Sequence, residues 1–231
     1  MKTTGILMKP ELVQASIDGV KDVTRRIIPQ AEAWDDNWRV DKAKDAPGSW
    51  CMRSGTKYSL PYFRCRYGAV GDILYVKETH YAYGYWVKDA SGWTFKGHGD
   101  VFGYKYMDNP PSPPDILTGY STETGWYKRP SLFMPRAAAR YFFQIEGLWA
   151  ERVQDITPAM AIREGIKSFR PVPGDGPAET LYWHYIKKKW GPSPVHSFQT
   201  LWQSVHGEES WDQNPWVWVV TYKKLHSLNK A

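Results

Sequence analysis

The stretch DGVKDVTRR, residues 18–26, decides how this chain is interpreted, because it concentrates a lysine, a threonine and two adjacent arginines in one corner. It follows a short amphipathic segment in which Pro10 begins a predicted helix and Gly19 ends it. In a turn after a helix end, residues three apart can converge. We therefore expect the side chains of Lys21 and Thr24 to lie within reach of each other.

These residue types suit nucleophilic catalysis. A lysine that is removed from water among cations loses its proton more easily, because burial and like charge both disfavour the ammonium form. Arg25 and Arg26 supply that like charge. A threonine hydroxyl becomes a nucleophile when a neighbouring base takes its proton, so Lys21 is a candidate base and Thr24 a candidate nucleophile. Alternatively, Lys21 is a surface residue near a helix C-terminus and Thr24 simply begins a strand.

A third candidate comes from GAVGDILYVKETHYAYGYW, residues 68–86, which predicts a strand after a glycine-rich turn. Alternation along this strand puts Glu78 on the same, inward face as Leu74. Glu78 is thus a candidate to orient the lysine or to carry a proton to a leaving group. The alternative is a structural ion pair with Lys77 or Arg136.

The remaining predicted elements are two strands and two helices. The segments 140–149 and 216–225 are rich in β-branched and aromatic residues, which favours strands. A capping residue followed by proline begins helices at 157–158 and at 193–194, and Gly165 and Gly207 end them. The second helix carries an apolar stripe expected to face the core, made of Phe198, Leu201, Trp202 and Val205.

Two long segments, about 30–66 and 84–128, show no regular pattern and are predicted to be irregular insertions, the second a possible lid. Long irregular connections argue against a doubly wound parallel sheet. We therefore expect an α+β fold, a small mixed β-barrel with helices packed around it. At 231 residues, the chain is expected to form a single domain, 1–231, with these two insertions.

The amino-acid composition indicates which class of binding partner to expect. The chain has 13 Trp, 15 Tyr and 8 Phe, more than a core needs, and a net charge of +6, which favours anionic partners such as nucleic acid. The two cysteines, Cys51 and Cys65, do not make a disulfide framework, so a reduced, cytoplasmic setting is expected. No sequence window predicts a signal peptide or membrane span, and the six histidines lack metal-ligand spacing, so we assign no metal and no cofactor.

The corner also fits a known signature. Gly19, Lys21, Thr24 and Arg26 match the G-x-K-x-x-T-x-R pattern of the ASCH family, a branch of the PUA-like barrels. The segment GAVGDILYVKET resembles the strand that follows in that family. Segments at both ends and in the centre of the chain resemble a phage and prophage subfamily: GVKDVTRRIIP, RPSLFMPRAAAR, VQDITPAMAIREGI and NPWVWVVTYK. This resemblance implies a curved β-barrel with a cleft that binds RNA or modified nucleotides.

Small bacterial ASCH members act as amidohydrolases on N4-acetylcytidine through lysine, threonine and glutamate. The resemblance therefore implies an N4-acylcytidine amidohydrolase in which Lys21, Thr24 and Glu78 are the catalytic residues. Two alternatives remain open: a noncatalytic module that binds RNA or a modified base, and an ASCH-type ribonuclease.

Further side chains are candidates for binding the substrate, and the oligomeric state is left open. An arginine or hydroxyl can donate to a developing oxyanion or hold a phosphate, and an aromatic ring can stack on an unpaired base. The candidates for these two roles are Arg26, Arg129, Ser131, Arg136, Tyr81 and Trp86.

Overall fold

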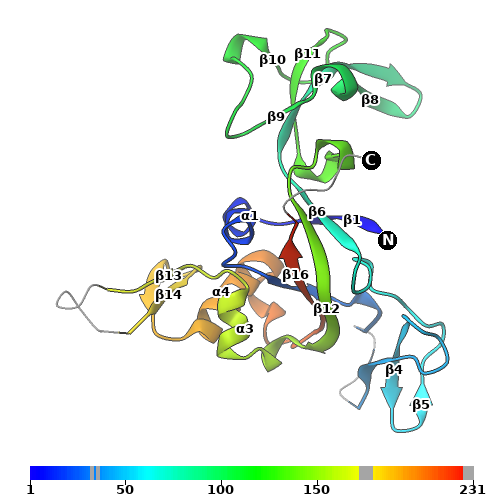
Figure 1. Cartoon of the computed structure of the whole chain (residues 1–231), viewed down its shortest axis with the longest axis vertical. Coiled ribbons are helices and arrows are strands. Elements are labelled where there is room, and N and C mark those ends of the chain that lie inside the picture. The colour runs from blue at the N-terminus through cyan, green and yellow to red at the C-terminus, as the bar shows by residue number, and fades with distance from the viewer. Residues whose placement is uncertain (32–33, 35–36, 172–178, 226–231) are drawn as a thin grey trace.

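The structure, a computed structural model, describes residues 1–31, 34, 37–171 and 179–225 (Figure 1). At its centre is a mixed five-stranded sheet, in which β1 is parallel to β6 and the other pairings are antiparallel. From one edge to the other, its strands are β1 (Thr3–Leu7), β6 (Ile73–Lys77), β12 (Phe142–Arg152), β16 (Trp216–Lys224) and β2 (Val23–Ile27). The α+β class expected from the sequence is confirmed.

The expected barrel is not found, because no backbone pairing joins the edge strands β1 and β2 within the described ranges. These strands meet instead through a side chain: a guanidinium nitrogen of Arg26 donates to the carbonyl oxygen of Leu7 at 2.6 Å. The sheet is therefore open along this edge, and side chains from both strands line the space beside it.

Two predicted strands form the centre of the sheet. β12 and β16 pair along most of their length, with one irregularity between Ile145 and Gly147. Their apolar side chains alternate between two buried clusters, one on each face. On one face Trp218 packs edge-on against Trp50 at 4.9 Å between ring centroids, and on the other Val217 and Val219 are buried with the helices.

Three helices flank the sheet: α1 (Pro10–Ile17), α3 (Pro158–Arg163) and α4 (Pro194–His206). The caps predicted for the last two are present, since Thr157 and Ser193 accept hydrogen bonds from backbone N–H groups three residues on. The stripe on α4 is mostly buried as predicted, but Val205 is 49% exposed. Val205 lies in the last turn of α4, where it lines a pocket.

The first insertion is more regular than the sequence indicated. Part of segment 30–66 forms a three-stranded antiparallel sheet, with β3 (Arg39–Lys42), β4 (Trp50–Ser54) and β5 (Lys57–Tyr58). Trp50 and Met52 from β4 belong to the main core, so this insertion covers one face of the central sheet.

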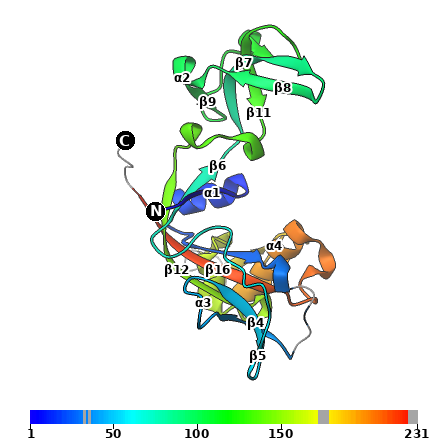
Figure 2. The same cartoon turned by 90° about the vertical axis from the view of Figure 1, so that its right-hand side faces the viewer.

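The second insertion is also regular. Together with the end of the predicted strand before it, it forms what we call the distal sheet: β7 (His80–Asp89), β8 (Gly92–Gly97), β9 (Tyr104–Tyr106), β10 (Ile116–Leu117) and β11 (Gly125–Arg129). The short helix α2 (Gly99–Phe102) accompanies it. Figures 1 and 2 show the distal sheet at one end of the molecule, on the opposite side of α1 from α3 and α4.

A small sheet beside α4 completes the fold, formed by β13 (Ser168–Phe169), β14 (Leu181–His184) and β15 (Lys189–Gly191). Single turns of 3-10 helix occur at Pro29–Ala31, Pro113–Asp115, Ser131–Phe133, Arg136–Ala138, Val153–Asp155 and Glu208–Ser210. Within the described residues, no helix has the length and apolar character needed to cross a bilayer.

Candidate functional site

The corner after α1 is turned inward by its backbone. Gly19 adopts a φ of +76°, a conformation that glycine adopts without steric cost. The N–H groups of Val20 and Lys21 both donate to the carbonyl oxygen of Ala15 at 2.9 Å, which closes the helix end. The Lys21 side chain is therefore directed into the protein, toward Val23 and Glu164, and the residue is only 2% exposed.

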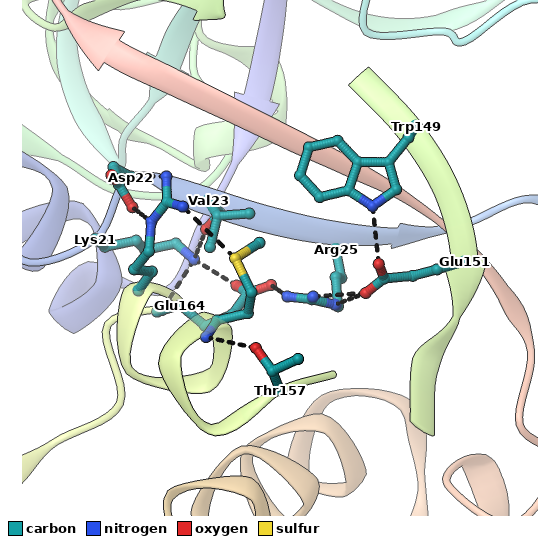
Figure 3. A network of polar contacts seen from close by, with 10 residues as sticks. Lys21, Asp22, Val23, Arg25, Trp149, Glu151, Thr157 and Glu164 are labelled. Atoms are coloured by element: carbon teal, nitrogen blue, oxygen red, sulfur yellow. Dashed lines mark hydrogen bonds and ion pairs between the residues drawn. The ribbon is translucent and has the colours of Figure 1, made fainter. Parts of the chain in front are cut away.

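The ammonium of Lys21 has three close acceptors (Figure 3). Its Nζ lies 2.6 Å from the carbonyl oxygen of Val23, 2.9 Å from that of Glu164 and 2.7 Å from Oε2 of Glu164. A protonated lysine has three N–H donors, so this environment satisfies all of them.

Arg25 extends the contact into a network. It donates to Oε1 of Glu164 at 3.1 Å and to Oε1 of Glu151 at 2.6 Å, and the indole N–H of Trp149 holds the other oxygen of Glu151 at 2.8 Å. The network thus balances two buried cations with two carboxylates. Because a lone buried charge is costly, each member depends on the others.

Burial lowers the pKa of the Lys21 ammonium, and the carboxylate of Glu164 opposes that shift. Arg26 and Arg25 add to the lowering. This is the direction expected from the sequence, with the same two arginines contributing, but the sequence did not indicate the opposing carboxylate.

Lys21 and Thr24 line one pocket of about 290 Å³, between the edge strands, α1 and α4. Its polar side also includes Arg25, Arg26 and Glu164. Its apolar side is formed by residues of α1, β1 and α4, chiefly Leu7, Leu12, Phe198, Leu201, Trp202 and Val205. The pocket is thus a mainly apolar hollow with its charged groups on one side, which is the general form of a small-molecule site.

Two polar atoms at this pocket lack partners. Among the described residues, the Thr24 hydroxyl makes no hydrogen bond, and Nε of Arg26 is buried without a partner. An unbonded hydroxyl is free to attack a substrate, and an unbonded N–H is available to stabilise negative charge.

Glu78 does not join Lys21 and Thr24. Its carboxylate pairs with Arg140 at 2.8 and 3.2 Å and lines a different cavity of about 470 Å³. The expected juxtaposition fails because β6 ends at Lys77, so the chain leaves the central sheet for the distal sheet at this residue. The carboxylate beside Lys21 is that of Glu164.

The other candidate binding residues are dispersed. Arg26 lies in the Lys21 pocket, whereas Trp86 and Arg129 line a cavity of the distal sheet. Tyr81 is buried in the distal sheet, Ser131 lines the cavity of Glu78, and Arg136 is exposed. Of the six, the structure brings only Arg26 to Lys21 and Thr24.

Sequence reasoning missed Glu164, although a signal was present. Glu164 directly precedes Gly165, at the C-terminal end of a predicted helix, where the partial negative charge of the helix disfavours a carboxylate. A carboxylate in this place therefore requires a nearby cation. Lys21 and Arg25 are those cations.

No family model, curated protein or solved structure matches the chain. Within the described residues, which do not include His226, no group of three or more His, Cys, Asp and Glu side chains is arranged to hold a metal ion.

Proposed function

We propose that the protein is a metal-independent amidohydrolase of the ASCH type, which removes an acyl group from the exocyclic N4 of a modified cytosine nucleoside or nucleotide. One observation carries the proposal: Lys21, Thr24 and Glu164 line a single pocket, and the Lys21 ammonium is buried against the Glu164 carboxylate. Glu164 replaces Glu78 in the expected set of three residues.

The first half-reaction forms an ester. Lys21 passes a proton to Oε2 of Glu164, 2.7 Å away, and the resulting amine takes the proton of the Thr24 hydroxyl. The Thr24 oxygen attacks the acyl carbonyl carbon, and the C–N4 bond breaks. The proton on Glu164 goes to N4, so cytidine leaves as a neutral amine and the lysine and glutamate return to their ionised forms.

The second half-reaction releases the acid. Lys21 again passes a proton to Glu164 and, as the amine, takes a proton from the attacking water. The C–O bond to Thr24 breaks, the proton on Glu164 restores the Thr24 hydroxyl, and the acid leaves. The guanidinium of Arg26, which lines the pocket, stabilises the oxyanion that develops in both halves. Arg129, Ser131 and Arg136 are not needed for this role. We assign the reaction to the cytoplasm, which suits Cys51 and Cys65 as buried free thiols.

The test is to incubate the full chain with N4-acetylcytidine and to follow cytidine and acetate by chromatography. We expect Thr24→Ala and Glu164→Gln to abolish turnover, Thr24→Ser to retain part of it, and Thr79→Ala, outside the pocket, to match the wild type. Full activity of Thr24→Ala would eliminate the ester mechanism. Shortening of labelled RNA in place of deacylation would favour the ribonuclease alternative.

A further inference from the structure

The distal sheet contains a cavity of about 600 Å³ that shares no lining residue with the Lys21 pocket. Half of its lining residues are aromatic side chains from β7, β8, β9 and the segments that follow β10 and β11. These are Trp86, Trp93, Phe95, Tyr104, Tyr120 and Phe133. So many rings around one cavity account for part of the aromatic surplus that a core does not need.

One cation lies among these rings. The guanidinium carbon of Arg129, on β11, lies 4.5 Å from the ring centroid of Trp86, 4.4 Å from that of Phe95 and 5.4 Å from that of Phe133. Aromatic faces attract a guanidinium and fix its plane. Arg129 is thereby held in one orientation while it lines the cavity.

Arg129 has no carboxylate partner in the described part of the chain. Burial lowers the pKa of its guanidinium, and the nearby Tyr120 hydroxyl partly offsets that shift. Arginines that are partly removed from water are ordinarily paired with an anion. Arg140, at the base of the distal sheet, is such a case, bonded to both Glu78 and Asp108.

The lining of the cavity includes two exposed rings. Trp93 and Tyr120 are stacked at 5.7 Å with an interplanar angle of 18°, and both are exposed, Trp93 by 38%. Lys88 lies 6.0 Å from the Trp93 ring, which adds a second positive charge beside these rings. A flat ring that enters here can pack on these faces on its way to Arg129.

The aromatic rings and the charge of Arg129 together indicate which class of ligand fits the cavity. A cationic ligand is repelled by Arg129, and a purely apolar one leaves the guanidinium buried without an anion. An anion that carries a flat ring satisfies both the rings and the charge. A nucleotide is such a ligand, and only an unpaired one can insert its base between side chains.

We propose that the aromatic cavity of the distal sheet binds an unpaired nucleotide of a single-stranded nucleic acid, with the base on the Trp93 and Tyr120 faces and the phosphate on Arg129. The site is separate from the Lys21 pocket and does not depend on the proposed deacylation. Thr24→Ala, which removes the proposed nucleophile, leaves it intact.

The experiment is fluorescence anisotropy with a labelled 12-nucleotide RNA, a DNA of the same sequence and the blunt duplex, at several salt concentrations. We expect both single strands to bind more tightly than the duplex, and a preference for RNA or DNA then identifies which strand the site serves. Stacking energies per base imply that Trp93→Ala weakens binding by about tenfold or more. Arg129→Gln should do the same and lower the salt dependence by about one phosphate contact.

Matched controls separate this site from general charge and surface effects. Trp190→Ala removes an indole of similar exposure in the small sheet beside α4, and Arg66→Gln removes an exposed cation that packs on Tyr67. Both should bind within about twofold of the wild type. Absence of single-strand binding, or equal losses in the cavity variants and the controls, would overturn the proposal. Circular dichroism establishes that each variant is folded.

Discussion

Glu164→Gln is the sharpest test of the buried network. The side chains of Lys21 and Arg25 are each 1% exposed and that of Glu164 is 5% exposed. The substitution therefore removes the carboxylate that pairs with Lys21 and leaves Arg25 with Glu151. Removing one partner of a buried pair costs about 3–5 kcal/mol of unfolding free energy. For a chain of this length, that loss lowers the melting temperature by about 6–20 °C.

The assay is urea unfolding followed by circular dichroism, with Glu78→Gln as the control. Glu78 makes the same kind of ion pair with Arg140, but the two side chains are 16% and 28% exposed, so its loss should cost about 1 kcal/mol or less. In a double-mutant cycle, Lys21→Met combined with Glu164→Gln should cost less than the sum of the single changes, because neither leaves the other's charge unpaired. An unfolding free energy for Glu164→Gln within about 1 kcal/mol of the wild type would refute the reasoning.

Three further predictions concern pH and backbone conformation. The proposed reaction uses the proton that Lys21 and Glu164 share, because this proton goes to N4. We therefore expect kcat/KM for deacylation to fall as pH rises through the pKa of Lys21, which burial lowers below 10.5. Arg26→Gln should move the midpoint of that fall upward, because Arg26 lowers the pKa of Lys21, and an unmoved midpoint in a pH-rate profile would contradict this. Gly165→Ala should lower the activity, and it should lower the unfolding free energy by more than about 1 kcal/mol. The reason is that Gly165 has a φ of +78° and that the new Cβ would lie 2.8 Å from Cβ of Lys21. Gly191→Ala, which has open space around it, is the control in the same urea assay. Burial lowers the pKa of His80 below 6.5. The unfolded chain therefore binds a proton at this histidine more readily than the folded one, so His80 destabilises the fold as pH falls below 6.5. Between neutral and acidic pH, the unfolding free energy of His80→Gln should fall by less than that of the wild type.

The turn at Gly19 was predictable, because its signals are local. Lys21 follows that turn and Thr24 lies on β2, and both line one pocket, but no hydrogen bond joins their side chains in the described part of the chain. The carboxylate was wrongly expected to be Glu78, because strand alternation was extended one residue beyond the true end of β6. Glu164 reaches Lys21 across 143 residues, and only the packing of α3 under β2 determines that contact.

The insertions illustrate a second limit. Gly, Pro and Tyr-rich sequence predicts irregular structure, yet β7 and β8 form a hairpin with six paired positions, because cross-strand ring contacts such as Trp86 with Phe95 compensate for weak local preference. A closed barrel was also expected from the sequence, whereas the central sheet is open between β1 and β2. Strand propensity predicts that strands form, but it does not show whether the first and last of them pair.

The position of the distal sheet in the chain has an evolutionary consequence. The polypeptide leaves the central sheet at the end of β6 and returns at the start of β12, and these two strands are hydrogen-bonded neighbours, with Tyr75 opposite Phe142. A short turn could therefore connect β6 directly to β12, and the central sheet would keep its strand order without the intervening residues. The distal sheet can in this way be gained, lost or exchanged as a cassette, and the nucleotide binding that we propose for it can diverge independently of the buried network around Lys21.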